Sequence, residues 1–249
     1  MFNLTLSKTD LIKNSVPIIA EILDEGIFKV DSNGMSLLSP DRSMIAVVNF
    51  QLLASAFDDF KSTGENLLGL NLANLVAILK RIRPEDKVKM AKEDESNTLK
   101  IILEGKGKRS FEIPLLDISS EKPPVDQLEF KGRVELDSNV LEEGISDADI
   151  VDDSVVLEAG NEGFKMWAKG DVSSTQLELK KGESGLLKVD ASESVRARYP
   201  LEYLKKMIKA AKLANQVSVE FATDYPMRLN FKDIDKVNLS FILAPRVEE

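Results

Sequence analysis

The chain has 249 residues and contains neither cysteine nor histidine. This excludes disulfides, zinc sites with Cys or His ligands, and catalytic groups of the Ser/His/Asp or Cys/His kind. The net charge of −9 argues against a module that is basic over its whole surface. No apolar stretch approaches the roughly 20 residues that cross a bilayer, and residues 1–6 alternate like a strand and lack signal-peptide features, so we expect a cytoplasmic protein.

Strand patterns dominate the first half of the chain. Apolar and polar residues alternate there as in half-buried antiparallel strands, over 26–30, 44–50, 67–70, 87–91, 99–104 and 110–115. Helical periodicity predicts four helices in the whole chain, over 8–23, 72–82, 137–146 and 200–213. These elements predict an α+β protein rich in antiparallel sheet.

Three local signals refine the predicted helices. Pro17 lies inside the first one and should kink it or end it near Ser15. Asp137 or Ser138 can cap the third helix, and Pro200 suits the first turn of the fourth.

The two halves of the chain resemble each other. Residues 20–27 correspond to 148–155 at an offset of 128 (148 − 20), and 75–80 correspond to 204–209 at an offset of 129 (204 − 75). Such a repeat predicts a duplicated domain, although chance similarity between amphipathic helices is the alternative. The proline pair Pro123-Pro124 cannot join a central strand. We therefore predict an N-terminal domain over 1–117, a connecting loop over 118–130 and a C-terminal domain over 131–249.

Acidic pairs are the only residues that suggest catalysis. They could hold Mg²⁺ or act as acid and base, but all lie beside turn signals, where solvated carboxylates are expected: Asp58-Asp59, Glu85-Asp86, Glu93-Asp94-Glu95 and Asp152-Asp153. Gly105-Lys106-Gly107 precedes a strand, which favours a hairpin turn over a phosphate-binding loop. A carboxylate- and metal-dependent two-domain hydrolase remains the alternative function. We predict no catalytic residue, metal or cofactor.

The basic residues on or beside the predicted helices are more informative than the acidic pairs. Neither half is basic overall, since residues 1–118 have 15 basic and 17 acidic residues and 119–249 have 18 and 25. On an α-helix, Lys205, Lys209 and Lys212 share one face through i, i+4, i+7 spacing. The lysines and arginines form either a solvated outer face, with favourable charge at helix C-termini, or a surface for a polyanion.

Several stretches together carry a family resemblance that covers nearly the whole chain. They are 24–34, 69–72 with 78–80, 111–117, and above all Leu243-Ala244-Pro245-Arg246 near the C-terminus. With these stretches the sequence resembles the DNA sliding clamps of the proliferating cell nuclear antigen (PCNA) family, most closely the archaeal type.

The resemblance implies a ring, usually a homotrimer, in which helices line a central hole around duplex DNA and antiparallel sheets form the outer wall. Such a clamp is not an enzyme. It acts as a processivity factor in DNA replication and DNA repair, it associates with the nucleoid, and an ATP-driven clamp loader opens it. Its partners are DNA polymerase, ligase and flap nuclease, which bind through PCNA-interacting peptides.

By the same resemblance, three groups of residues receive roles. The DNA-facing group is Lys8, Lys13, Lys80, Arg81, Arg83, Lys205, Lys209 and Lys212. The partner-peptide pocket comprises Pro40, Met44, Ile45, Val47, Val125, Leu128, Pro226, Ile242, Ala244 and Pro245; plain core packing is the alternative for its apolar members. The subunit interface comprises Arg109, Phe111, Ile113, Thr175, Leu177 and Leu179, on one edge strand in each domain.

Two departures from the family pattern bear on these roles. Residues 39–44 read Ser-Pro-Asp-Arg-Ser-Met, where archaeal relatives usually have Met-Asp-Pro-Ser-Arg, so we expect an altered pocket rim. The third helix carries Glu142, Glu143 and Asp147. If Glu142 faces the hole, the second domain's first helix should attract DNA weakly or repel it, and the hole should be electrostatically uneven.

Overall fold

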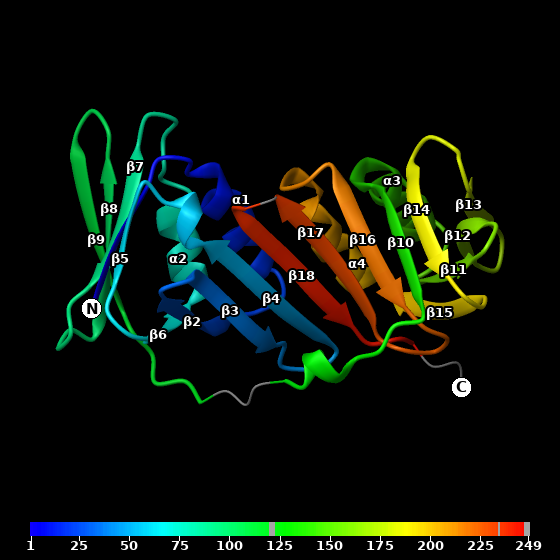
Figure 1. The fold of residues 1–249 in the computed structure, drawn as a ribbon, viewed down its shortest axis with the longest axis horizontal. Coiled ribbons are helices and arrows are strands. Elements are labelled where there is room, and N and C mark those ends of the chain that lie inside the picture. Colours follow the sequence, from blue (N-terminus) through cyan, green and yellow to red (C-terminus); the bar gives the residue numbers. More distant parts are fainter. Residues whose placement is uncertain (120–122, 234, 247–249) are drawn as a thin grey trace. The chain divides into compact units, whose positions relative to one another are not determined.

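The computed structural model describes residues 1–119, 123–233 and 235–246. Residues 120–122 of the predicted connecting loop, and residues 234 and 247–249 of the predicted C-terminal domain, lie outside the described part. The chain forms two compact units. The first contains Met1–Arg42, Val48–Pro123 and Asp233–Leu239, and the second contains Ser43–Val47, Pro124–Lys232 and Ser240–Glu249. Compared with a division by sequence, Ser43–Val47 therefore belongs to the second unit and Asp233–Leu239 to the first; Figure 1 colours the chain by residue number.

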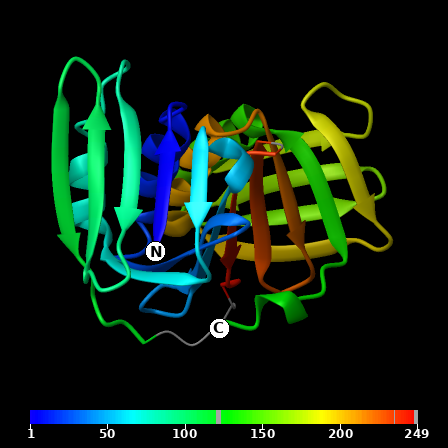
Figure 2. The ribbon, with the colours of Figure 1, turned by 60° about the vertical axis from the view of Figure 1, so that its left-hand side comes forward.

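The first unit is built from antiparallel strands and two helices. One sheet has the order β5-β1-β7-β8-β9, with β1 between β5 and β7 (Figure 2). In a second sheet β2 pairs with both β3 and β6. The elements are β1 (Phe2–Leu6), α1 (Asp10–Ile19), β2 (Glu25–Asp31), β3 (Gly34–Pro40), β4 (Ala46–Leu53), the 3₁₀ turn η1 (Ala54–Ala56), β5 (Asp59–Ser62), β6 (Asn66–Asn71), α2 (Leu72–Leu79), β7 (Lys87–Lys92), β8 (Thr98–Glu104) and β9 (Lys108–Pro114).

The second unit repeats this plan. One sheet has the order β13-β12-β11-β15, and in another β10 pairs with β14 and β16, and β16 with β17. The elements are the 3₁₀ turn η2 (Val125–Gln127), β10 (Gly132–Asp137), α3 (Ser138–Asp149), β11 (Ser154–Gly160), β12 (Gly163–Lys169), β13 (Ser174–Lys180), β14 (Leu186–Ala191), β15 (Val195–Pro200), α4 (Leu201–Met207), the 3₁₀ helix η3 (Ile208–Lys212), β16 (Gln216–Phe221), β17 (Met227–Asp233) and β18 (Val237–Leu243). The last strand contributes residues to both units.

The predicted duplication is confirmed at matching hairpins. Gly34 begins β3 and Gly163 begins β12, with φ of +136° and +156°, which L side chains rarely adopt. A Cβ would lie 2.2 Å from the Leu52 carbonyl oxygen at the first position and 2.1 Å from the Leu179 carbonyl oxygen at the second. Each repeat therefore requires glycine at the same point.

Alternation and capping explain most elements. In β10 the residues alternate between buried and more exposed, as expected for a strand with one face on a core. The predicted cap of the third helix is confirmed, because the Asp137 side chain accepts a hydrogen bond from the Asn139 N–H at 2.8 Å. Asn71 caps α2 in the same way by accepting from the Asn74 N–H at 3.0 Å.

The first helix differs from its prediction in two respects. It begins at Asp10, so Lys8 precedes it, and an acidic first turn suits the positive end of the helix dipole better than a lysine. It also runs through Pro17 to Ile19. Ile18 and Ile19 are both buried. Burying two isoleucines gains about 3–6 kcal/mol, which is enough to offset a helix proline at about 3 kcal/mol.

Other boundaries also differ from prediction. The α-helical part of the fourth helix ends at Met207 and continues as the 3₁₀ helix η3. The strand predicted from 44 begins at Ala46, because Met44 adopts a left-handed conformation with φ of +57°. Among the described residues, no helix is long and apolar enough to cross a membrane.

Candidate DNA-facing and partner-binding surfaces

A basic group gathers at the C-terminal end of α2 in the first unit. Lys80 is the C-cap residue, and Arg81 and Arg83 follow on the loop to β7; all three are exposed. Lys13, on α1, donates from Nζ to the Ile82 carbonyl oxygen at 3.4 Å. Cations at this end of a helix are favoured by its dipole. The structure thus brings together four of the predicted DNA-facing residues.

A buried carboxylate holds this loop. Asp86 accepts a hydrogen bond from the Arg83 N–H at 2.8 Å and forms an ion pair with Arg109 of β9. Arg109 also donates from Nη1 to the Arg81 carbonyl oxygen at 3.0 Å. The backbone hydrogen bond from Arg83, followed by the Arg109 guanidinium, holds the pKa of Asp86 below its usual range. Nothing in the sequence alone indicated this network.

Lys8 lies apart from that group. Its Nζ is 4.0 Å from a carboxylate oxygen of Asp233, and both side chains are partly exposed. A pair of this kind contributes little stability and partly neutralises the lysine. Lys8 is therefore a weaker candidate for a DNA-facing role than the residues after α2.

The lysines of the second unit are less uniform than their spacing predicted. Lys205 pairs with Asp149, at the end of α3, at 2.8 Å. Lys209 and Lys212 lie in η3, where three residues make a turn and side chains at i and i+3 eclipse. These two exposed lysines therefore share a face. Adding two steps of 100° and two of 120° places Lys205 about 80° from them, so the three lysines line up less closely than a continuous α-helix predicts.

The acids of α3 point to solvent. Glu142, Glu143 and Asp147 are all exposed. Lys131 pairs with Glu193 at 2.7 Å, and Arg133 pairs with Glu220 at 3.0 Å, so each has an acidic partner outside α3. The lysine that reaches α3 is Lys205, through Asp149.

The predicted pocket residues gather in the second unit. Its segments Ser43–Val47 and Ser240–Glu249 meet at a hydrogen bond from the Ala244 N–H to the Ile45 carbonyl oxygen, of 2.9 Å. Met44 is 73% exposed and Ile45 37%, whereas Ile242 is only 8% exposed. Exposed apolar side chains beside a buried apolar floor are typical of a binding surface.

Further predicted pocket residues come from the loop before β10 and the turn before β17. Val125 is buried, and its carbonyl oxygen accepts from Arg228 Nη2 at 3.3 Å. Pro226 is half-buried and follows Tyr225, whose carbonyl oxygen accepts from the Tyr199 hydroxyl at 2.7 Å. Burial raises the pKa of Tyr199, so its hydroxyl stays a neutral donor.

The remaining predicted pocket residues differ in their surroundings. Val47 and Leu128 are half-buried, and so are Ala244 and Pro245. Pro40 ends β3 in the first unit.

The end of the described chain is tied down by residues that sequence reasoning missed. The Arg246 N–H donates to the Arg198 carbonyl oxygen at 2.7 Å, and its guanidinium pairs with Asp153. Ala244 and Pro245 therefore lie between two backbone hydrogen bonds to different segments of the second unit. The basic residue after the Leu-Ala-Pro motif was visible in the sequence, but its acidic partner is 93 residues away.

The predicted interface residues lie on edge strands. β9 and β13 each stand at the end of their sheet. Phe111, Thr175 and Leu177 are half-buried within the chain, whereas Ile113 and Leu179 are buried in it. In β9, Arg109 is already engaged by Asp86. The side chains best placed to meet another molecule are thus Phe111 and Leu177.

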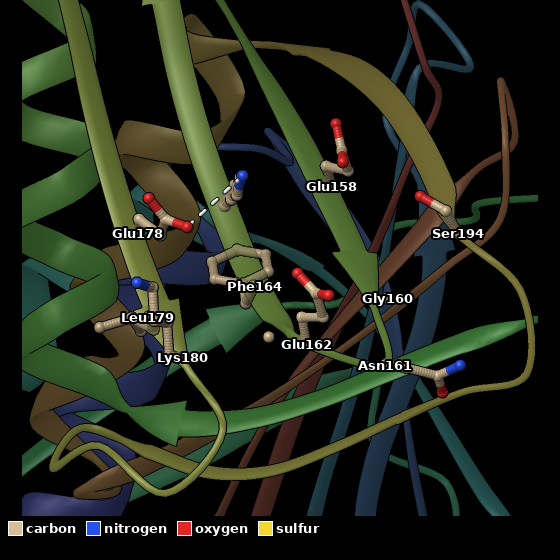
Figure 3. Close-up of a pocket in the computed structure, with 11 residues that line it drawn as sticks. Glu158, Gly160, Asn161, Glu162, Phe164, Glu178, Leu179, Lys180 and Ser194 are labelled. Atoms are coloured by element: carbon tan, nitrogen blue, oxygen red, sulfur yellow. Dashed lines mark ion pairs between the residues drawn. The ribbon is translucent and has the colours of Figure 1, made fainter.

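A separate cleft of 560 Å³ lies on the β11–β12 hairpin of the second unit (Figure 3). Phe164 is among its lining residues, and Lys165 of β12 pairs with Glu178 of the neighbouring strand β13 at 3.4 Å. Of the predicted residues it contains only Leu179. Its acids come from β11, the turn before β12, and β13, and among the residues described no group of three or more Asp or Glu side chains could hold a metal ion.

Two similar α+β units, each with antiparallel sheets and a pair of helices, define the two-domain clamp fold. A solved structure described as PCNA from Thermococcus kodakaraensis shares this fold, with a TM-score of 0.91 over 99% of this chain and 100% of that one, at 23% identity.

Sequence comparison then gives the family. The model of the proliferating cell nuclear antigen N-terminal domain matches residues 1–122, and that of the C-terminal domain matches 124–246. Proteins named DNA polymerase sliding clamp are similar along most of their length. That of Nanoarchaeum equitans is 33% identical, covering 97% of this chain and 98% of its own, and that of Thermococcus gammatolerans is 33% identical, covering 92% of each. The chain belongs to the PCNA family, is of its archaeal type, and is not an enzyme.

Proposed function

We propose that this protein is a DNA polymerase sliding clamp, a homotrimeric ring that encircles duplex DNA and serves as a processivity factor. The observation that carries the proposal is family membership over both domains, together with exposed cations at the ends of α2 and η3 in an otherwise acidic chain. A ring needs only weak, sequence-independent attraction to phosphates, because topology retains the DNA. An acidic outer wall and a locally basic lining fit that requirement.

Ring closure would use the two edge strands. β9 of one subunit would pair with β13 of the next, and repetition of this head-to-tail contact closes a ring when the rotation allows it. Edge strands left unpaired favour association with other chains, which is why a partner strand is expected there. Phe111 and Leu177 would supply apolar contacts across the boundary.

The apolar surface of the second unit would receive partners. A short helix of a PCNA-interacting peptide would place its apolar anchors between Met44, Ile45 and the Ala244-Pro245 segment. Replicative polymerase, ligase and flap nuclease would bind in this way, and an ATP-driven clamp loader would open the ring. The protein would then act on nucleoid DNA in the cytoplasm.

Analytical ultracentrifugation tests the proposal. The protein alone should sediment as a trimer, and a fraction should co-sediment with circular primed DNA only when a clamp loader and ATP are present. A monomer at micromolar concentration, or equal co-sedimentation with the circle whether or not the loader and ATP are present, would contradict it.

A further inference from the structure

Asp86 touches both candidate surfaces of the first unit. Its side chain is 3% exposed, and it binds the Arg83 N–H on the loop after α2 and the Arg109 guanidinium on β9. Arg109 also donates a hydrogen bond from Nη1 to the Arg81 carbonyl oxygen at 3.0 Å. A single carboxylate thus joins the basic loop to the edge strand.

The surroundings of Asp86 leave room for this arrangement. Gly105, in the turn between β8 and β9, faces the carboxylate, and a Cβ there would lie 2.3 Å from Asp86 Oδ1. The Asp86 N–H donates back to the Arg83 carbonyl oxygen at 3.0 Å, so loop and aspartate hold each other reciprocally. Any larger residue at position 105 would displace the carboxylate.

The charges nearby make the carboxylate necessary. Residues 80–87 together with Arg109 contain five cationic side chains and two acids, for a net charge of 5 − 2 = +3: Lys80, Arg81, Arg83, Lys87 and Arg109, against Glu85 and Asp86. Glu85 is exposed, whereas Asp86 is buried. Removing one partner of a buried pair leaves the other uncompensated. Without Asp86, Arg109 would leave the loop.

We propose that Asp86 is a positioning residue that holds the DNA-facing loop and the subunit-edge strand β9 in one geometry, and so couples duplex binding to ring assembly. The inference rests on the proposed clamp function. It makes a prediction opposite in sign to simple electrostatics. Removing an acid beside a DNA-binding surface should strengthen DNA binding, whereas removing a positioning residue should weaken it.

The test compares Asp86→Asn with Glu85→Gln, which make the same change in charge on adjacent residues. Titration of a fluorescent linear duplex over a range of salt should show affinity raised up to about twofold in Glu85→Gln, and lowered roughly threefold or more in Asp86→Asn. Sedimentation over a dilution series should show that the trimer dissociates at higher concentration only in Asp86→Asn. Equal gains in DNA affinity, with assembly unchanged in both, would overturn the proposal.

Arg109→Lys keeps the inference testable if Asp86→Asn does not fold, as judged by thermal melting. Lysine retains the charge but lacks the planar fork through which Arg109 binds Asp86 with one nitrogen and the Arg81 carbonyl oxygen with another. We expect weaker duplex binding and weaker assembly at unchanged net charge, and wild-type behaviour in both assays would refute the coupling. The clamp function is tested separately by loading of the wild-type protein onto circular DNA. If the wild type loads and the Asp86 and Arg109 variants behave as the wild type does, the coupling is refuted but the clamp function is not.

Discussion

Reversal of charge at Lys209 tests where DNA contacts the second domain. Lys209 and Lys212 share a face of η3, and Lys205, about 80° away around the helix, pairs with Asp149. Lys209→Glu would change the ring by 3 × (−2) = −6 charges in a homotrimer. Because the residue is exposed, the fold should tolerate the change.

The expected magnitude follows from counterion release. Each phosphate contact contributes about 0.9 to the slope of log affinity against log salt concentration, so the loss of one to three contacts lowers the slope by about 0.9–2.7. When the salt concentration is raised fourfold, both affinities should fall. The factor by which the wild-type affinity falls should be about 3 to 40 times larger than the factor for the variant. At moderate salt its absolute affinity should still be lower.

Duplex retention measured over that salt range, with ring assembly checked by sedimentation, gives the result. Lys206→Glu is the matched control, because Lys206 lies on the same helix but pairs with Glu202 at 3.2 Å and sits over the Tyr203 ring. It should leave the slope nearly unchanged. Equal slopes for Lys209→Glu and the wild type would refute a DNA-facing Lys209.

Four further predictions, made with five substitutions, test other parts of the account. Phe111→Ala should cost about 3 kcal/mol at each interface and release monomers at micromolar concentration, and a stable trimer by sedimentation would contradict this. Ala244→Arg should weaken binding of a labelled PCNA-interacting peptide at least about tenfold, and Ile45→Arg less, because Ile45 lies nearer to solvent; wild-type affinity in both would remove the pocket assignment. Glu142→Lys should raise duplex affinity and steepen its salt dependence, and no change in either would refute the uneven hole. The pKa of Asp86 is lowered in the folded protein, so its contribution to stability is present above about pH 4 and is lost as pH falls through the folded-state pKa. In Asp86→Asn the free energy of unfolding in urea should therefore fall less steeply as the pH is lowered. The same steepness in the variant and the wild type would contradict this.

The sequence predicted those parts of the fold that depend on local periodicity. Alternation of apolar and polar residues predicted the strands, because one face of each strand packs on a core. Asp137 was correctly predicted as a helix cap, because its side chain binds the N–H only two residues along the chain. The repeat was visible because residues 20–27 and 75–80 recur at 148–155 and 204–209, and the structure adds that Gly34 and Gly163 stand where the matching hairpins require glycine. Local patterns left two outcomes open at Pro17, a kink or an end near Ser15, and the helix does not end there, because burial of the following isoleucines outweighs the proline penalty.

The candidate site residues were named from the sequence, but their contacts were not. The basic residues after α2 were named from sequence, yet the carboxylate that holds them pairs with a residue 23 positions away. The neutralisation of Lys205 by Asp149 spans 56 positions. Contacts of this kind depend on tertiary packing, which no local pattern encodes. The change to a 3₁₀ helix at Ile208 likewise altered the face that three lysines were expected to share.

The most direct test of the account is whether the protein is held on DNA by topology. The protein should be loaded onto nicked circular DNA, separated from free protein by gel filtration at moderate salt, and the circle then cut once with a restriction enzyme. A clamp should stay with the intact circle and be released when the DNA becomes linear. Equal retention on circular and linear DNA would contradict encirclement.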